Sequence, residues 1–318
     1  MDRGRRPAAL AAVLAAAALA ASDTPPLAEM RWLAPGADAV AALGQQPSEC
    51  FQWPTLSAGE LTSIGVGRAA FRSPLLLGGQ AARTGLSCET CHRNGRTNPD
   101  FQFPGVSGPP GTADVTSSLF SSHRGNGVDD PKPIPDLGGP RAALKVDHDP
   151  RSKALETFIR GLITEEFDGP EPTPAVLAGL AAYIRTLDPA ACSSPKPLRA
   201  DDYLGDALSG VIAAHYALEA KDPATALVMV AAARARLGRL DERFVGLPRS
   251  LAALRKSNAD LMRLERMIRA SDPRALARIR AWTLAVDGLA VTLRRDEPRS
   301  LFNPERLAAA ARLPRQGL

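Results

Sequence analysis

The sequence predicts an all-α protein with two helical units. Only 5% of its 318 residues are aromatic, whereas alanine and arginine are abundant, and this balance favours helices over sheets. With 45% hydrophobic and 23% charged residues, the chain is long and apolar enough for two modest globular domains. Several prolines follow Asp, Asn or Thr, the usual order at the start of a helix. We expect one unit over residues 57–192, a linker over 193–200 and an antiparallel helical bundle over 201–318.

The first 22 residues are typical of a signal peptide. Three arginines precede an apolar run over residues 8–20, which ends in a small-residue cleavage site at 18–20. The run has 13 residues, fewer than the roughly 20 that a membrane span requires, and no later stretch is long enough. Arg5-Arg6 lacks the rest of a twin-arginine motif, which favours the general secretory route. We therefore expect a periplasmic protein without a stable membrane span, and an irregular segment over residues 23–56.

The net charge gives no reason to expect a nucleic-acid partner. Residues 1–20 contain three arginines and one aspartate, so their removal leaves 36 basic and 33 acidic side chains and lowers the formal charge from +5 to +3. Scattered arginines on helical faces are more often solvated surface than a nucleic-acid footprint.

The segment Ser87-Cys88-Glu89-Thr90-Cys91-His92 contains C-x-x-C-H, the attachment motif of a c-type haem. In this interpretation Cys88 and Cys91 form thioethers to the porphyrin and His92 is the proximal iron ligand of a single haem c. A redox dithiol and a zinc knuckle are the alternatives. The adjoining histidine and the export signal favour haem, and residues 85–87 read as a loop rather than the strand that a redox dithiol usually follows.

The other two cysteines, Cys50 and Cys192, form an even remainder in an oxidising compartment, so we expect a disulfide between them. Its loop of 141 intervening residues would contribute on the order of 4 to 5 kcal/mol to stability in the chain-entropy model. The alternative is two unrelated free thiols.

Two helices should frame the first unit. One begins at Ser57 and ends near Pro74, with buried positions at Leu61, Ile64, Val66 and Phe71. The other has Thr173 as N-cap and Pro174 as first residue. A third helix is expected over residues 152–167. The stripe of the Thr173 helix consists of Val176, Leu177, Leu180, Tyr183, Ile184 and Leu187, and Gly179 within it permits a close helix crossing.

These blocks resemble the bacterial dihaem cytochrome c peroxidases and their methylamine-utilisation relatives. The block from Gly67 to Leu75 is similar to the Gly-Arg-x-Leu-Phe-x-Asp-Pro-x-Leu block that precedes Ser-Cys-x-x-Cys-His in that family, and residues 114–119 are similar to its Asn-Thr-Pro-Ser-Leu segment. His123-Arg124-Gly125 lies where a His-Asp-Gly motif would be sought. The resemblance covers roughly residues 57–190 and implies a cytochrome c-like haem domain, with Tyr183 in its C-terminal helix packing near the haem.

The chain departs from that family in one respect that matters for chemistry. Family members carry two C-x-x-C-H motifs, whereas this chain has one. A two-haem mechanism therefore does not run in a single copy, and the chain resembles half of such an enzyme or a relative reduced to electron transfer.

The sixth iron ligand decides between these functions. The methionines beyond the first residue lie outside the domain's distal region, at positions 30, 229, 262 and 267, so methionine ligation from within the domain is excluded. His123 is our preferred distal ligand because small residues flank it, and His148, between two aspartates, is the second choice. If neither binds, the iron is five-coordinate and open to peroxide or a diatomic gas. Glu165 and Glu166 are then candidate acids, although a helical surface is their more common place.

Residues 93–150 are predicted to form a long loop, and a loop of this length in a compact domain usually packs around a ligand or another element. We expect it to pack around the edge of the haem. Phe101 and Phe103 would pack on the porphyrin or simply fill the core. Candidate partners of the haem propionates, chosen by charge and fork geometry alone, are Arg96, Arg124 and Arg141.

The C-terminal bundle carries no catalytic pattern. Its helices are expected at about 203–220, 223–238, 249–270, 273–295 and 304–312, with breaks at Asp222-Pro223, Pro248, Asp272-Pro273 and Asn303-Pro304. His215 reads as a core or boundary histidine rather than a ligand. The arginines at 234, 236, 239 and 243 form either a solvated face, which we favour, or a basic face for an acidic redox partner. The bundle is thus a docking or structural module.

Three functions fit this sequence. The first is single-electron transfer between periplasmic partners by a monohaem c-type cytochrome. The second is a peroxidase-like oxidoreductase with an open distal site. The third is a haem-based sensor or an assembly subunit whose bundle binds a partner protein.

Overall fold

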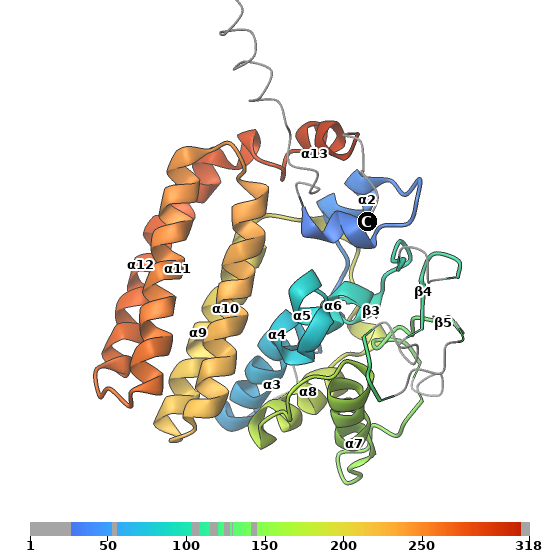
Figure 1. Cartoon of the computed structure of the whole chain (residues 1–318), viewed down its shortest axis with the longest axis horizontal. Helices are drawn as coiled ribbons and strands as arrows, with labels where there is room; N and C mark the ends of the chain where they lie inside the picture. Colours follow the sequence, from blue (N-terminus) through green and yellow to red (C-terminus); the bar gives the residue numbers. More distant parts are fainter. Residues whose placement is uncertain are drawn as a thin grey trace, which may run out of the picture.

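The computed structural model describes residues 27–52, 56–103, 108–114, 120–123, 128, 130–140 and 145–312. The expected signal peptide lies outside these residues, as do Arg124, Arg141 and most of the segment 114–119. The described chain is mostly helical, which confirms the all-α prediction at that level (Figure 1). Its strands are two residues long and pair as β1 with β6, β2 with β3 and β4 with β5. None of the described helices is long and apolar enough to cross a membrane.

Helices α3 (Ala58–Phe71) and α8 (Pro174–Arg185) cross at two glycines, of which the sequence analysis predicted Gly179. A Cβ atom on Gly67 would lie 1.9 Å from the carbonyl oxygen of Gly179, so only glycine allows this approach. The caps also follow the prediction: Ser57 forms a capping box with Glu60, and Thr173 accepts from the amide of Val176.

The buried stripes of the two helices follow the prediction with two exceptions. On α3 the side chains of Ile64, Val66 and Phe71 are buried, and on α8 all predicted positions are buried except Leu177, which is partly exposed. Leu61 is exposed and its expected burial is wrong. It lies in the first turn of α3, before the crossing point at Ser63 and Gly67.

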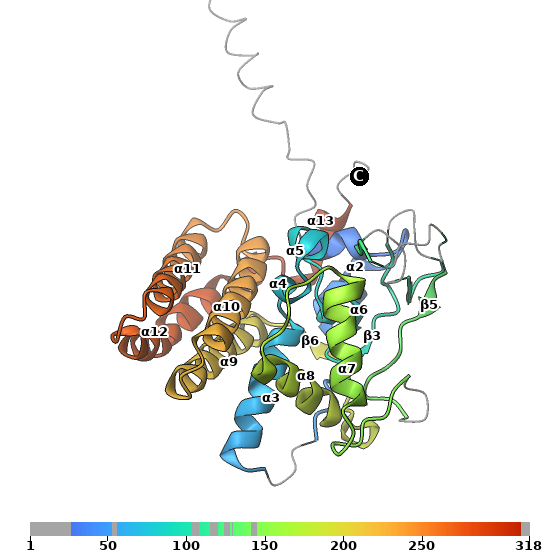
Figure 2. The same ribbon diagram turned by 60° about the horizontal axis from the view of Figure 1, so that its bottom comes forward.

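Short elements connect these two helices and lie on one side of the bundle (Figures 1 and 2). The helix expected over residues 152–167 is α7 (Ala154–Gly161), which continues as a π-helical turn, η3 (Leu162–Glu166). In chain order the connecting elements are α4 (Pro74–Leu77), α5 (Gly79–Thr84), α6 (Cys88–Cys91), β2 (His92–Arg93), β3 (Arg96–Thr97), β4 (Thr112–Ala113), β5 (Lys132–Pro133), α7 (Ala154–Gly161) and η3 (Leu162–Glu166).

The predicted disulfide between Cys50 and Cys192 is confirmed, with 4.1 Å between the two Cα atoms. Strand β1 (Gln45–Gln46) pairs with β6 (Lys196–Pro197) beside it, and Phe51 bridges to Leu187. The short helix η4 (Pro189–Ala191) leads into Cys192. The disulfide therefore fastens two segments that the backbone also pairs, at the two ends of the first unit.

The bundle consists of four long helices, α9 (Ala200–Glu219), α10 (Pro223–Arg243), α11 (Pro248–Arg269) and α12 (Ala275–Asp296), followed by η5 (Glu297–Arg299) and α13 (Pro304–Ala311). Figure 1 shows the four long helices side by side. Asp222 and Asn303 cap α10 and α13 as predicted. At Asp272-Pro273 the prediction is wrong by two residues. The carboxylate of Asp272 accepts from the amide of Arg274 in a turn, and the helix starts at Ala275.

The two units share one hydrophobic core. A single cluster of buried side chains runs from α3 and α8 into the bundle, and α3 contacts both α9 and α10. Within the expected linker 193–200, Leu198 and Ala200 are buried. The bundle is thus packed onto the first unit along its length rather than tethered by a free linker.

The sequence predicts an irregular N-terminal segment over residues 23–56, and this prediction is wrong for part of it. It contains the 3₁₀ helix η1 (Ala28–Trp32) and helix α2 (Ala39–Gly44), which pack with α13 in a second, smaller core. Helices this short have little stability alone and depend on tertiary packing, which local sequence patterns do not report.

Candidate functional site

The C-x-x-C-H motif spans helix α6 and the first residue of strand β2. Its two cysteines are the first and last residues of α6, and a capping box between Ser87 and Thr90 fixes the start of this helix. The side-chain amide of Asn98 donates to the carbonyl of Thr90 at 2.9 Å. The chain then reverses between β2 and β3 through Asn94 and Gly95, which both have positive φ.

The two motif thiols are free, partly buried and packed against the main core. Burial raises the pKa of Cys88 to about 12, and burial likewise raises the pKa of Cys91 far above its usual range. A redox dithiol instead needs a lowered thiol pKa, because the thiolate is the nucleophile. The described residues contain no cluster of three or more His, Cys, Asp or Glu side chains that could hold a metal ion.

The His92 imidazole is oriented by a backbone carbonyl. Its Nδ1 lies 3.0 Å from the carbonyl oxygen of Pro135, and because a carbonyl only accepts, Nδ1 carries the proton. Burial lowers the pKa of His92 to about 4, so the ring is neutral near pH 7 and the lone pair is on Nε2. A histidine that ligates a metal commonly donates its other ring nitrogen to a carbonyl in this way. The motif residues therefore fit covalent attachment and proximal ligation of a haem.

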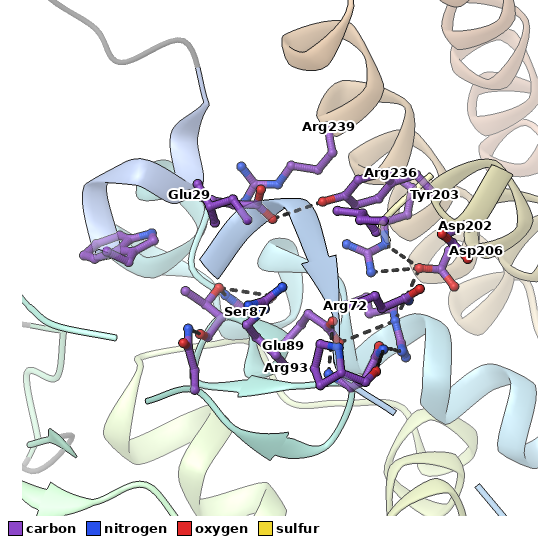
Figure 3. Close-up of a pocket in the computed structure, with 18 of the residues that line it drawn as sticks. Glu29, Arg72, Ser87, Glu89, Arg93, Asp202, Tyr203, Asp206, Arg236 and Arg239 are labelled. Atoms are coloured by element: carbon purple, nitrogen blue, oxygen red, sulfur yellow. Dashed lines mark hydrogen bonds and ion pairs between the residues drawn. The ribbon is translucent and has the colours of Figure 1, made fainter. Parts of the chain in front are cut away.

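The face of the motif that carries Ser87, Glu89 and Arg93 lines a polar pocket. Figure 3 shows Ser87, Glu89 and Arg93 on one side and helices α9 and α10 on the other. The N-terminal segment closes the pocket with Glu29 and Trp32. The side chains from the bundle are Asp202, Tyr203, Asp206, Arg236, Arg239 and Arg243.

Arg72 is the centre of a buried ionic network beside this pocket. Its guanidinium lies 3.0 Å from Glu49, and 3.4 Å from both Glu89 and Asp206. It also donates to the Asn94 side chain at 2.7 Å. Because Glu89 lies between the two cysteines, the network connects the motif to helix α9.

The arginines control the protonation of these acids. Burial raises the pKa of Glu49, but Arg72 and Arg68 outweigh it and lower the pKa to about 2. Burial likewise opposes ionisation of Asp206, yet Arg68, Arg72 and Arg236 hold its pKa well below the usual range. Both carboxylates are therefore charged at every pH at which the protein is expected to work.

The bundle arginines do not form the solvated face that we favoured. Arg236 and Arg243 are buried and Arg234 and Arg239 are half-buried. Their partners lie within the protein. Arg236 pairs with Asp206, Arg243 donates to the carbonyls of Leu43 and Leu301, Arg234 pairs with Glu265, and Arg239 donates to the carbonyl of Gly85. Arg239 and Arg243 thus join the bundle to Gly85 and Leu43 outside it, whereas Arg234 and Arg236 pair between helices of the bundle.

The two candidate distal histidines lie in different surroundings. The His123 side chain is 61% exposed, and its Nδ1 lies 2.9 Å from Asp168, so among the described residues it contacts this aspartate and Ser122 rather than the motif. His148 is half-buried, and its backbone carbonyl accepts from Arg185. His215, expected at a core boundary, lies 3.2 Å from Glu219 on its own helix.

The remaining candidates have structural partners. Phe101 and Phe103 are fully buried and pack with Trp32 and Phe120 in an aromatic cluster. The guanidinium of Arg96 pairs with the carboxylate of Asp136 through both Nε and Nη2, so these nitrogens already have a partner. Of the two candidate acids, Glu166 is buried, not exposed as the sequence suggested, because it ends the π-helical turn that turns it inward. Glu165 is partly exposed.

Sequence reasoning missed four residues of this site. Pro135 orients His92, and Glu49, Arg72 and Asp206 form the network behind the motif. Only Arg72 had a signal, since it lies within the block from Gly67 to Leu75 that the sequence analysis singled out.

Comparisons with known proteins add no assignment to this geometry. No family model matches the chain, and neither a curated protein nor a solved structure is significantly similar to it.

Proposed function

We propose that this protein is an exported c-type cytochrome that carries one haem on Cys88, Cys91 and His92 and transfers single electrons in the periplasm. The observation that carries the proposal is the pairing of His92 with Pro135, which presents a neutral imidazole with its lone pair on Nε2, one residue after two unoxidised thiols.

A bound haem would supply a one-electron couple, and the protein would set how that couple is used. His92 would hold the iron from one side, with its ring fixed by Pro135. The electrons would pass to and from a periplasmic redox protein.

The first experiment is to produce the full chain in a bacterial host that exports it and matures c-type cytochromes. The purified protein should keep its haem in denaturing gel electrophoresis, and the mass should increase by one haem after loss of the signal peptide. Cys88→Ser with Cys91→Ser should abolish attachment, whereas His215→Ala should not. A wild-type protein that loses all haem on denaturation, or that carries none, overturns the proposal.

A second candidate function is peroxide reduction at an open distal site. It is compatible with the contact between Nδ1 of His123 and Asp168, 2.9 Å apart, and it requires that His123 does not bind the iron. The ferric spectrum distinguishes the two functions. A low-spin wild type that becomes high-spin in His123→Ala, but not in His148→Ala, establishes His123 as ligand and electron transfer as the function. A high-spin wild type that reacts with hydrogen peroxide in the presence of a reduced donor favours the peroxidase-like function.

A further inference from the structure

The outer face of α12 is apolar although it lies at the edge of the bundle. Figures 1 and 2 both place α12 beside α11 at this edge. Leu284 is 81% exposed, more than the other large hydrophobic side chains of the described residues, and Val291 is 65% exposed. Three small exposed residues lie on the same face, namely Ala277, Ala281 and Gly288.

The five residues follow the spacing of a helix-pairing seam. They occur at intervals of four, three, four and three residues, the alternation of a and d positions in a heptad repeat. The face that packs on the bundle is the opposite one, with Ile279, Trp282, Val286, Leu289 and Leu293. The seam is therefore not needed for the fold of one chain.

No contact among the described residues requires glycine at position 288. A Cβ atom there would meet nothing within 4 Å, and the residue has an ordinary helical backbone. Glycine inside a helix is costly to stability, so its presence needs a reason. A second helix that approaches closely at this position supplies one.

The charges beside the seam identify the orientation of that second helix. Arg280 and Asp287 are exposed, lie seven residues apart and occupy equivalent flanking positions of the heptad. In an antiparallel pair of α12 helices centred on Leu284, Arg280 of each copy faces Asp287 of the other, which gives two ion pairs. In a parallel pair Arg280 would face Ala285 and Asp287 would face Thr292, with no complementary charge.

We propose that two copies of this protein associate through α12, antiparallel about a two-fold axis at Leu284. The α12 faces of two copies are complementary in shape and in charge, as an isologous interface requires. One helix pair buries less than a standard protein interface, so the dimer should dissociate on dilution. This inference does not depend on the haem and refines our expectation that the bundle serves in docking.

The test uses Leu284→Cys in the purified protein, with or without haem. On mild oxidation it should form a disulfide-linked dimer in high yield, because the two-fold axis brings position 284 of both copies together. Wild-type protein treated in the same way should remain unlinked. The wild type should also show a monomer–dimer equilibrium by sedimentation velocity over the micromolar range.

Substitutions that leave the fold intact test the seam. Leu284→Glu should shift the equilibrium to monomer by at least tenfold in the dissociation constant. Leu75→Glu, an exposed leucine on α4, should not change it. Arg280→Glu should weaken the dimer, and Arg280→Glu with Asp287→Arg should restore it. A wild type that stays monomeric, or a Leu284→Cys protein that does not link, overturns the proposal and indicates that another molecule covers this face.

Discussion

Arg72, the C-cap residue of α3, and Asp206 of α9 form a buried ion pair, with Nε and Oδ2 3.4 Å apart and with 2% and 8% of their side chains exposed. Arg72 also pairs with Glu89, the residue directly after the first motif cysteine. One guanidinium thus connects the motif to the bundle. For this reason the bundle is part of the site's framework.

We expect Asp206→Asn to destabilise the protein by about 3 kcal/mol, because removing one partner of a buried ion pair leaves its arginines uncompensated. Urea unfolding followed by circular dichroism measures this loss. Asp201→Asn is the matched control: Asp201 lies on the same helix and pairs with Arg294 at the surface, so its loss should cost less than about 1 kcal/mol. Equal effects of the two substitutions would contradict the importance of the network.

Glu49 should make the protein sensitive to acid. Its pKa is lowered from 4.5 to about 2 in the folded protein by Arg72 and Arg68, which outweigh the opposing effect of burial. A lowered folded-state pKa gives stability that is complete above pH 4.5 and is lost as the pH falls from about 4.5 to 2, on the order of 3 kcal/mol. Glu49→Gln should lower stability at pH 7 and flatten the dependence between pH 5 and 2. An unchanged slope in the variant would refute this assignment.

The helix crossing should tolerate no side chain at position 67. In Gly67→Ala the new methyl group would lie 1.9 Å from the carbonyl oxygen of Gly179, so the two helices must separate. We expect a loss of about 3 kcal/mol or more. Gly65→Ala, on the same helix with nothing within 4 Å, should instead stabilise by about 0.5 to 1 kcal/mol. Thermal unfolding of both variants tests the contrast, and a change of the same sign in both would be inconsistent with it.

Loss of the disulfide should be costly because it closes a long loop. The double variant Cys50→Ser with Cys192→Ser should lose about 5 kcal/mol relative to the oxidised wild type, by the chain-entropy relation for a separation of 142 residues. Reduced wild type should unfold at the same urea concentration as the double variant. A wild type that is indifferent to reductant would show that β1–β6 pairing alone holds these ends together.

Local signals in the sequence were sufficient for the long helices and their caps. Ser57, Thr173, Asp222 and Asn303 each act as the N-caps they were expected to be, and Gly179 marks the crossing. The pairing of Cys50 with Cys192 followed from counting thiols in an oxidising compartment.

The charged network could not be predicted in the same way. A local sequence pattern does not distinguish an arginine that faces water from one that faces Asp206. Asp206 is 30 residues away from Arg236 and 134 residues away from Arg72, so neither pair can be recognised from neighbouring residues. Burial of these charges depends on how α9 and α10 lie against α3. The haem itself, its distal ligand and export remain predictions.

The small core formed by η1, α2 and α13 brings the two ends of the described chain together. Leu27 and Leu43 pack in one cluster with Leu301 and Leu307, and Figure 1 shows α2 beside α13. A short peptide could therefore join residue 312 to residue 27, and new ends could be opened at the exposed turn around Gly246, between α10 and α11. A circular permutant with its new ends at the turn around Gly246 should retain both hydrophobic cores and the geometry of the motif.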